Sequence, residues 1–135
     1  MKTFFVEMIT PERMFFKGNI EQLVVETVDG YMGILAGHVP TVTALKQGAI
    51  RFFADGKWNE VANSAGFVEI RPDETIVLAQ ALEWSYEIDA NRAREAAERA
   101  EDVLRQARSR KEYELSKASL ARAFARLRVK SHYHE

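Results

Sequence analysis

A chain of 135 residues with 47% hydrophobic and 29% charged side chains is long enough for one well-packed core and has the composition of an ordinary globular protein. It contains no cysteine, which excludes disulfides and thiolate metal sites. The formal net charge of −1 is unevenly distributed, because residues 1–84 carry 7 basic and 11 acidic side chains and residues 85–135 carry 12 and 9. The positive excess of the C-terminal part is too small to indicate nucleic-acid binding, but it suits an acidic partner or a polyanionic ligand.

The sequence shows no membrane-directed segment. No apolar run approaches the roughly 20 residues that a spanning helix needs. The N-terminal residues enter a strand-like pattern without the basic and apolar regions of a secretion signal. We therefore expect a protein that neither crosses a membrane nor is secreted by that route.

The first predicted elements are strands at Thr3–Ile9 and Ile20–Thr27, and a proline-containing turn ends the first of them. In the second strand, Leu23 and Val25 lie on one face and Glu26 lies on the other. Two faces of different polarity predict a sheet with one buried side.

Three glycines, Gly30, Gly33 and Gly37, follow within eight residues. Their spacing matches neither a dinucleotide fingerprint nor a phosphate loop. We interpret them as residues that permit tight or left-handed turns. No nucleophile or set of metal ligands accompanies His38, so we interpret this side chain as stabilising a turn or contacting a partner.

Two hairpins are predicted next. The dipeptide Asp55-Gly56 between Ala49–Ala54 and Lys57–Ala62 favours a type I′ turn, and a short turn joins Gly66–Arg71 to Thr75–Ala79. Short strands at this spacing predict an antiparallel β-sandwich or barrel for the N-terminal part. That part shows no catalytic triad, carboxylate pair or metal cluster, so we interpret it as a docking platform.

The pattern changes at Leu82–Ala93, where alternating residues give way to apolar residues recurring every three or four positions. Asp89 is predicted to be the N-cap of a first helix. The apolar stripe predicted along that helix is mostly alanine: Ala93, Ala96, Ala100, Val103 and Ala107. The sequence thus divides into residues 1–84, a sandwich, and residues 85–135, a helical part.

A second helix is predicted at Tyr113–Lys130 after a turn at Ser109–Lys111. Its predicted stripes are Leu120, Phe124 and Leu127 on one side and Ala118, Ala121 and Ala125 on another. The two helices would form an antiparallel hairpin. Because small side chains bury little area, this hairpin would be weakly held and detachable.

Four arginines flank the alanine stripes: Arg92, Arg99, Arg122 and Arg126. If the stripes meet, these guanidinium groups converge beside Asp89 and repel one another unless an anion lies between them. The alternative is a solvated basic face with glutamates of the first helix as local partners. The spacing alone leaves both interpretations open.

Four segments occur in order along the chain: Gly37-His38-Val39-Pro40, Gln47–Arg51, Ile88–Ala93 and Leu120–Val129. Together they resemble the epsilon subunit of bacterial proton-translocating ATP synthase, and the resemblance covers essentially the whole chain. It implies an α+β chain with a ten-stranded N-terminal β-sandwich and a C-terminal two-helix hairpin. It also implies a non-catalytic subunit of the rotating central stalk, peripheral to the cytoplasmic face of the cell membrane.

The resemblance implies partners as well. The sandwich would bind the gamma subunit and the polar loops of the c-ring, with Tyr31, Met32, Gly33 and His38 at the contact. Many relatives carry an acidic residue where this chain has Tyr31 and a proline where it has Ala36, which affects the detail of the ring contact. The hairpin would be mobile, insert among the alpha, beta and gamma subunits, and oppose ATP hydrolysis.

ATP is implied as a regulatory ligand of the folded-down hairpin, and no cofactor is required. The implied nucleotide-binding residues are Glu83, Ile88, Asp89, Arg92, Arg99, Arg122 and Arg126. Two other classes of protein remain as alternatives. One is a free-standing ligand-binding sandwich with an accessory hairpin, and the other is a helical nucleic-acid binder that uses Arg122, Arg126 and Arg128.

Overall fold

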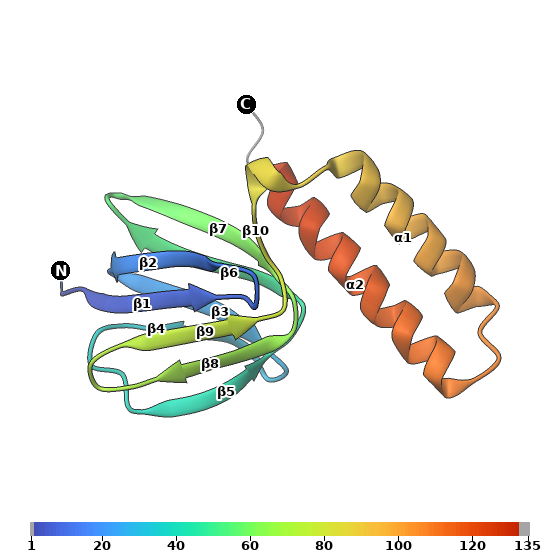
Figure 1. Ribbon diagram of the computed structural model, residues 1–135. Coiled ribbons are helices and arrows are strands. Elements are labelled where there is room, and N and C mark those ends of the chain that lie inside the picture. Colours follow the sequence, from blue (N-terminus) through green and yellow to red (C-terminus); the bar gives the residue numbers. More distant parts are fainter. Residues whose placement is uncertain (1, 133–135) are drawn as a thin grey trace.

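The computed structural model describes residues 2–132. Ten strands form one continuous sheet that folds over on itself as a sandwich, and a helical hairpin follows (Figure 1). This architecture confirms the predicted fold class. Among the described residues, no helix has both the length and the apolar composition needed to cross a bilayer.

The strand order in the sheet is β10-β7-β6-β3-β5-β8-β9-β1-β2, with β4 paired to β3 outside this path. Strands β1 and β9 are parallel, and the other pairs are antiparallel. The strands are β1 (Phe4–Ile9), β2 (Met14–Ile20), β3 (Gln22–Thr27), β4 (Gly30–Ile34), β5 (Thr41–Leu45), β6 (Gly48–Ala54), β7 (Lys57–Asn63), β8 (Gly66–Ile70), β9 (Thr75–Ala79) and β10 (Leu82–Trp84).

Sequence patterning did not find β2, β4, β5 or β10. Strand β4 is the clearest case, because Gly33 pairs with Val24 across the β3–β4 ladder instead of forming a turn. Gly30 and Gly37 do have positive φ angles, as predicted, at 114° and 84°. A glycine inside a strand weakens the sequence signal, and the partner strand decides the conformation.

The hairpin between β6 and β7 confirms the strongest local prediction. Asp55 and Gly56 have φ angles of 53° and 77°, as a type I′ turn requires, and Ala54 pairs with Lys57 across it. The turn fixes the register of both strands. It therefore decides which residues of β7 face the core and which face the hairpin helices.

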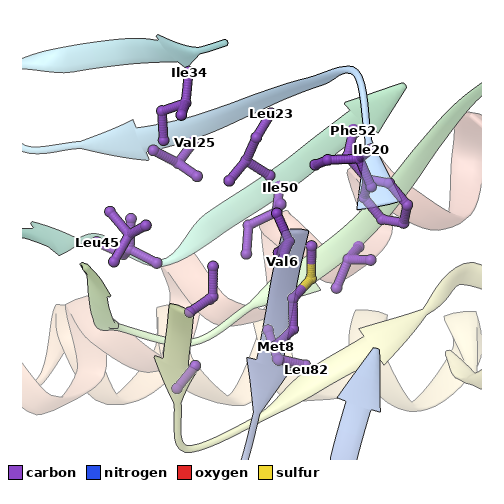
Figure 2. Packing of buried hydrophobic residues seen from close by; sticks show 14 of the residues in the cluster. Val6, Met8, Ile20, Leu23, Val25, Ile34, Leu45, Ile50, Phe52 and Leu82 are labelled. Carbon is purple, nitrogen blue, oxygen red and sulfur yellow. The ribbon is translucent and has the colours of Figure 1, made fainter. Parts of the chain in front are cut away.

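The core lies between the two layers of the sandwich (Figure 2). Side chains from most of the strands meet there, and the largest fully buried ones include Phe52, Met8, Ile20 and Leu23. Each such side chain contributes roughly 1.5–3 kcal/mol relative to an exposed one. The last residue of this core cluster is Leu82, so the sandwich core contains no residue of either α-helix.

Helix α1 (Ala90–Arg105) follows the short 3-10 helix η1 (Ser85–Glu87). The Asp89 carboxylate accepts a hydrogen bond from the Arg92 backbone N–H at 3.1 Å, which confirms the predicted N-cap. The helix ends at Arg105, so Ala107 does not extend its alanine stripe.

Helix α2 (Arg110–His132) is longer than predicted and begins three residues earlier. The Glu112 N–H donates to Ser109 Oγ at 3.1 Å, and the Glu112 carboxylate accepts from the Arg108 N–H at 3.0 Å. These two bonds satisfy backbone donors at the helix start. The Ser-x-x-Glu spacing that marks this start was present in the sequence but was interpreted as a turn.

The predicted stripes of α2 are largely wrong. Phe124 is 52% exposed, and Ala118 and Ala121 are also exposed. The residues of α2 that are buried are Ser116, Ala123, Ala125 and Val129. Helix α2 lies between the sandwich and α1 (Figure 1), so it buries mostly small residues on two faces, and the predicted stripe of large residues is not its buried face.

Candidate functional site

A groove of ≈480 Å³ lies between α1 and α2. Arg99 of α1 and Arg122 and Arg126 of α2 line it, together with small residues such as Ala100 and Ser119. Most of the other lining residues are alanine or serine, which lets the two helices approach closely. The structure thus brings together three of the four arginines that the sequence predicted to converge.

Glu83 provides the acidic group of this region. Arg126 Nε lies 2.7 Å from Glu83 Oε1, and Arg126 Nη2 donates to Glu83 Oε2 at 3.2 Å. The Nε–H itself is not directed at an acceptor, so the pair is held by charge and by one hydrogen bond. Both side chains are about three-quarters buried, and the carboxylate orients Arg126 beside the groove.

Ile88, Asp89 and Arg92 do not line the groove. Ile88 is buried in a small apolar cluster with Val129 of α2, and Asp89 caps α1 through the Arg92 backbone N–H. The Arg92 side chain is exposed, seven residues before Arg99 on the same helix. In this conformation the structure therefore places Arg99, Arg122 and Arg126 along one groove and leaves Arg92 and Asp89 outside it.

The groove is suited to an anion. Three guanidinium groups around one opening carry more positive charge than the single carboxylate of Glu83 neutralises, and guanidinium groups bind phosphate oxygens in pairs. Among residues 2–132, no group of three or more metal-ligating side chains is placed to hold a metal ion. The groove therefore supplies charge compensation through its arginines.

The four predicted partner-contact residues differ in their exposure. Tyr31 is 73% exposed on β4 and Gly33 is also exposed, whereas Met32 points the other way and packs against the sandwich core. His38 lies in the loop after β4, and its Nδ1 is 2.8 Å from the Val39 carbonyl oxygen. Met32 therefore lies on the inner face of β4, opposite to the other strand residues of the set.

A second exposed surface was not predicted. Ile9, Ala44, Phe67 and Leu78 line an apolar groove of ≈640 Å³ across the outer face of β1, β9, β8 and β5. Phe67 is 56% exposed there. Because exposed apolar patches on monomeric proteins are often functional, this face is a candidate for an interaction surface.

Sequence analysis also missed the residues where α2 meets the sandwich. Glu26 was assigned to a polar outer face, but it is only 7% exposed, and Glu60 is equally buried. Their partners are Arg128 and His132 of α2. The burial of these two carboxylates has no local signal in the sequence, because their partners are far away in the chain. Arg128 is 102 residues from Glu26, and His132 is 72 residues from Glu60.

Comparison with known proteins matches both parts of the chain to one family. The beta-sandwich domain of the ATP synthase delta/epsilon chain matches residues 3–85, and the long alpha-helix domain of the same chain matches residues 87–131. A protein named ATP synthase epsilon chain from Caldanaerobacter subterraneus subsp. tengcongensis is 44% identical over 135 residues, which cover 99% of this chain and 98% of the relative. A protein of the same name from Ruminiclostridium cellulolyticum is 47% identical over 127 residues, with 94% and 95% covered.

Solved structures share the fold. A chain of the Euglena gracilis mitochondrial ATP synthase OSCP/F1/c-ring structure superposes with a TM-score of 0.82 at 19% identity, covering 98% of this chain and 82% of that one. A chain of the Tetrahymena thermophila mitochondrial ATP synthase central stalk/c-ring structure gives a TM-score of 0.64 at 11% identity, with 96% and 97% covered.

Proposed function

Because the chain belongs to the ATP synthase delta/epsilon chain family, we propose that it is the epsilon subunit of a bacterial proton-translocating ATP synthase. In this role it is a non-catalytic part of the rotating central stalk, peripheral to the cytoplasmic face of the membrane. The observation that carries the proposal is the match of both the sandwich and the hairpin to that family over nearly the whole chain.

The sandwich is the part that docks. We assign the gamma contact to the apolar groove around Phe67 and Leu78, because a large partner would bury these exposed side chains. We assign the c-ring contact to the exposed Tyr31 and to the loop that carries His38 and Val39. Met32 is left out of the ring contact because it packs inward.

The hairpin is the regulatory part. Its apolar contact with the sandwich is a small cluster of Ala49, Ala62, Ile88 and Val129, separate from the sandwich core. Because this contact is small and separate from the core, the two helices can undock while the sandwich stays folded. In the assembled enzyme the released hairpin would insert among the alpha, beta and gamma subunits and oppose ATP hydrolysis.

ATP is the proposed ligand of the docked hairpin. Arg99, Arg122 and Arg126 would meet the phosphates, since they already share one groove. Arg92 and Asp89 would join from the start of α1, and Glu83 would accept from the adenine amino group or the ribose. ATP would favour the docked state by its differential affinity, about 2.7 kcal/mol at 100 times the dissociation constant.

Calorimetric titration of ATP into the isolated chain tests this assignment. Wild type should bind without hydrolysis, and Arg126→Ala and Arg92→Ala should each lower the affinity more than tenfold, because a charge-assisted contact contributes about 1.5–3 kcal/mol. Arg105→Ala is the matched control, since Arg105 pairs with Asp102 at the far end of α1. Equal affinities in all four proteins, or no binding by wild type, would refute the site.

The nucleic-acid alternative is disfavoured by where the three arginines lie in the docked hairpin. Arg122 and Arg126 line the groove between the helices, whereas Arg128 pairs with Glu26 of the sandwich. The three side chains therefore do not form one exposed basic surface.

A further inference from the structure

Two buried carboxylates lie under the last turns of α2. Glu26 of β3 and Glu60 of β7 are each only 7% exposed. Arg128 Nη2 donates to Glu26 Oε2 at 2.6 Å, and His132 Nδ1 lies 2.5 Å from Glu60 Oε1. Charged groups at such a depth need compensating partners, and α2 supplies one for each carboxylate: Arg128 for Glu26 and His132 for Glu60.

The sandwich is shaped to hold the Glu26 carboxylate. The Ala49 backbone N–H donates to Glu26 Oε2 at 2.8 Å. The neighbouring residue is Gly48, and a Cβ atom there would lie 2.7 Å from the carboxyl carbon of Glu26. A side chain at this position would push the Glu26 carboxylate away from the place where Ala49 and Arg128 bind it.

The geometry of α2 places basic side chains on both sides of its apolar contact. At 3.6 residues per turn, Arg126 and Lys130 lie on one side of Val129, and Arg128 and His132 lie on the other. The first pair binds the junction, through Glu83 and through the Ser85 carbonyl oxygen, which accepts from Lys130 Nζ at 3.2 Å. The second pair binds the sandwich carboxylates.

The apolar contact between these flanks is small. Ala125 and Val129 face β6 and β7, where Ala49 and Ala62 are their neighbours. Alanine side chains bury little apolar area and therefore contribute little to docking. The charged contacts must supply much of the remaining preference for the docked position.

We propose that Glu26, Glu60, Arg128 and His132 form an electrostatic clasp that sets how often the hairpin leaves the sandwich when no ligand is bound. The clasp is separate from the arginine groove, since Arg128 and His132 do not line that groove. The proposal rests on the proposed function only in that the hairpin must be able to undock. When α2 undocks, water replaces Arg128 and His132 around the two carboxylates, and the sandwich can therefore stay folded.

The absence of cysteine in the chain permits a direct test with the full-length protein. In a Val129→Cys background the new thiol is fully buried while the hairpin is docked, so its rate of reaction with a disulfide reagent at fixed pH reports undocking. Ala62→Cys, on the sandwich side of the same contact, is the second probe and guards against a local effect of changing α2.

Glu26→Gln keeps the shape and the Ala49 contact but removes the charge, and Gly48→Ala displaces the carboxylate without changing Glu26. Each should raise the labelling rate about tenfold, as expected for loss of a charge-assisted hydrogen bond. Glu69→Gln is the matched control, because Glu69 forms an exposed pair with Arg71 on β8. The clasp proposal would be overturned if, with both cysteine probes, the labelling rates of Glu26→Gln and Gly48→Ala equalled that of the control.

A double-mutant cycle separates direct pairing from general destabilisation. The Glu26→Gln/Arg128→Gln protein should be labelled no faster than Arg128→Gln alone, because one change already breaks the bond. Additive increases would refute a direct role of the pair.

The labelling rates also distinguish failure of the clasp from failure of the proposed function. If the wild-type protein is labelled at a measurable rate that does not change in Glu26→Gln, only the clasp is refuted. If no variant is labelled, the hairpin does not undock, and the mobile hairpin of the proposed function is refuted as well.

Discussion

The Arg13–Glu87 ion pair joins the turn after β1 to η1, next to the start of the hairpin. Arg13 Nη2 lies 2.9 Å from both carboxylate oxygens of Glu87, and the Trp84 N–H donates to Glu87 Oε1 at 2.9 Å. Burial favours the neutral form of Glu87, but the Arg13 hydrogen bond, the Trp84 N–H and the charge of Arg13 outweigh it. The pKa of Glu87 is therefore lowered from its ordinary value of 4.5.

A carboxyl with a lower pKa in the folded than in the unfolded chain stabilises the fold above its unfolded pKa, and this stabilisation is lost as the pH falls through the folded value. Glu87→Gln should therefore lower the free energy of unfolding at pH 7 by at most about 1 kcal/mol, since the pair is partly exposed. The difference from wild type should shrink as the pH falls from about 5 towards 2. Urea unfolding at each pH measures it, and a constant difference would contradict the ion-pair role.

Asp89 has one observed role and one proposed role, and substitutions can separate them. Asp89→Ala should destabilise α1 by about 1 kcal/mol through loss of the cap, whereas Asp89→Ser should preserve the cap because serine is also a good N-cap residue. Both should weaken ATP binding if the carboxylate contacts the nucleotide. Circular dichroism and calorimetry together check this, and ATP affinity in Asp89→Ser equal to wild type would leave Asp89 as a cap only.

At the level of the elements, the sandwich is expected to fold without the two helices. Its core cluster ends at Leu82, and Trp84 packs against it by stacking on Phe15 at a centroid distance of 4.6 Å. A chain ending at Tyr86 should therefore fold and bind gamma, although it loses the small cluster under α2. Thermal unfolding and co-purification with gamma measure this. Loss of gamma binding in a folded truncated chain would refute the division between docking and regulation.

At the scale of the whole molecule, the basic residues of α2 have two opposed effects in the proposed mechanism. Arg126 and Arg128 hold the hairpin down through Glu83 and Glu26, and the same charges would attract a released hairpin to acidic segments of the beta subunit. Neutralising arginines changes both effects. Changing Glu26 releases the hairpin and leaves its charge intact.

We therefore expect the reconstituted ATP synthase with Glu26→Gln to hydrolyse ATP more slowly than the wild-type complex. The complex with Arg122, Arg126 and Arg128 all changed to glutamine should hydrolyse faster than the Glu26→Gln complex, because its released arm lacks the attracting charge. Truncation after Tyr86 should remove inhibition altogether. Equal hydrolysis rates in the Glu26→Gln and triple-arginine complexes would argue that inhibition is purely steric.

The sequence by itself determined the features that depend on neighbouring residues. Asp55-Gly56 specified a type I′ turn because few other residues accept two successive positive φ angles. Asp89 specified a helix start because its carboxylate can reach the free N–H groups of the first turn. The change of period at Leu82 separated strands from helices. These signals are local, so they remain visible without a three-dimensional structure.

The tertiary structure alone decided which faces are covered. The sequence predicted a Leu120–Phe124–Leu127 stripe and an alanine stripe on α2, yet Phe124 is exposed, Ala123 lines the groove toward α1 and Val129 packs on the sandwich. The helix lies between α1 and the sandwich, and both neighbours decide which of its faces are buried. Glu26 appeared to be solvated, yet Arg128 covers it from 102 residues away. Burial and ion pairing depend on how distant segments pack, and periodicity within one segment carries no information about that packing.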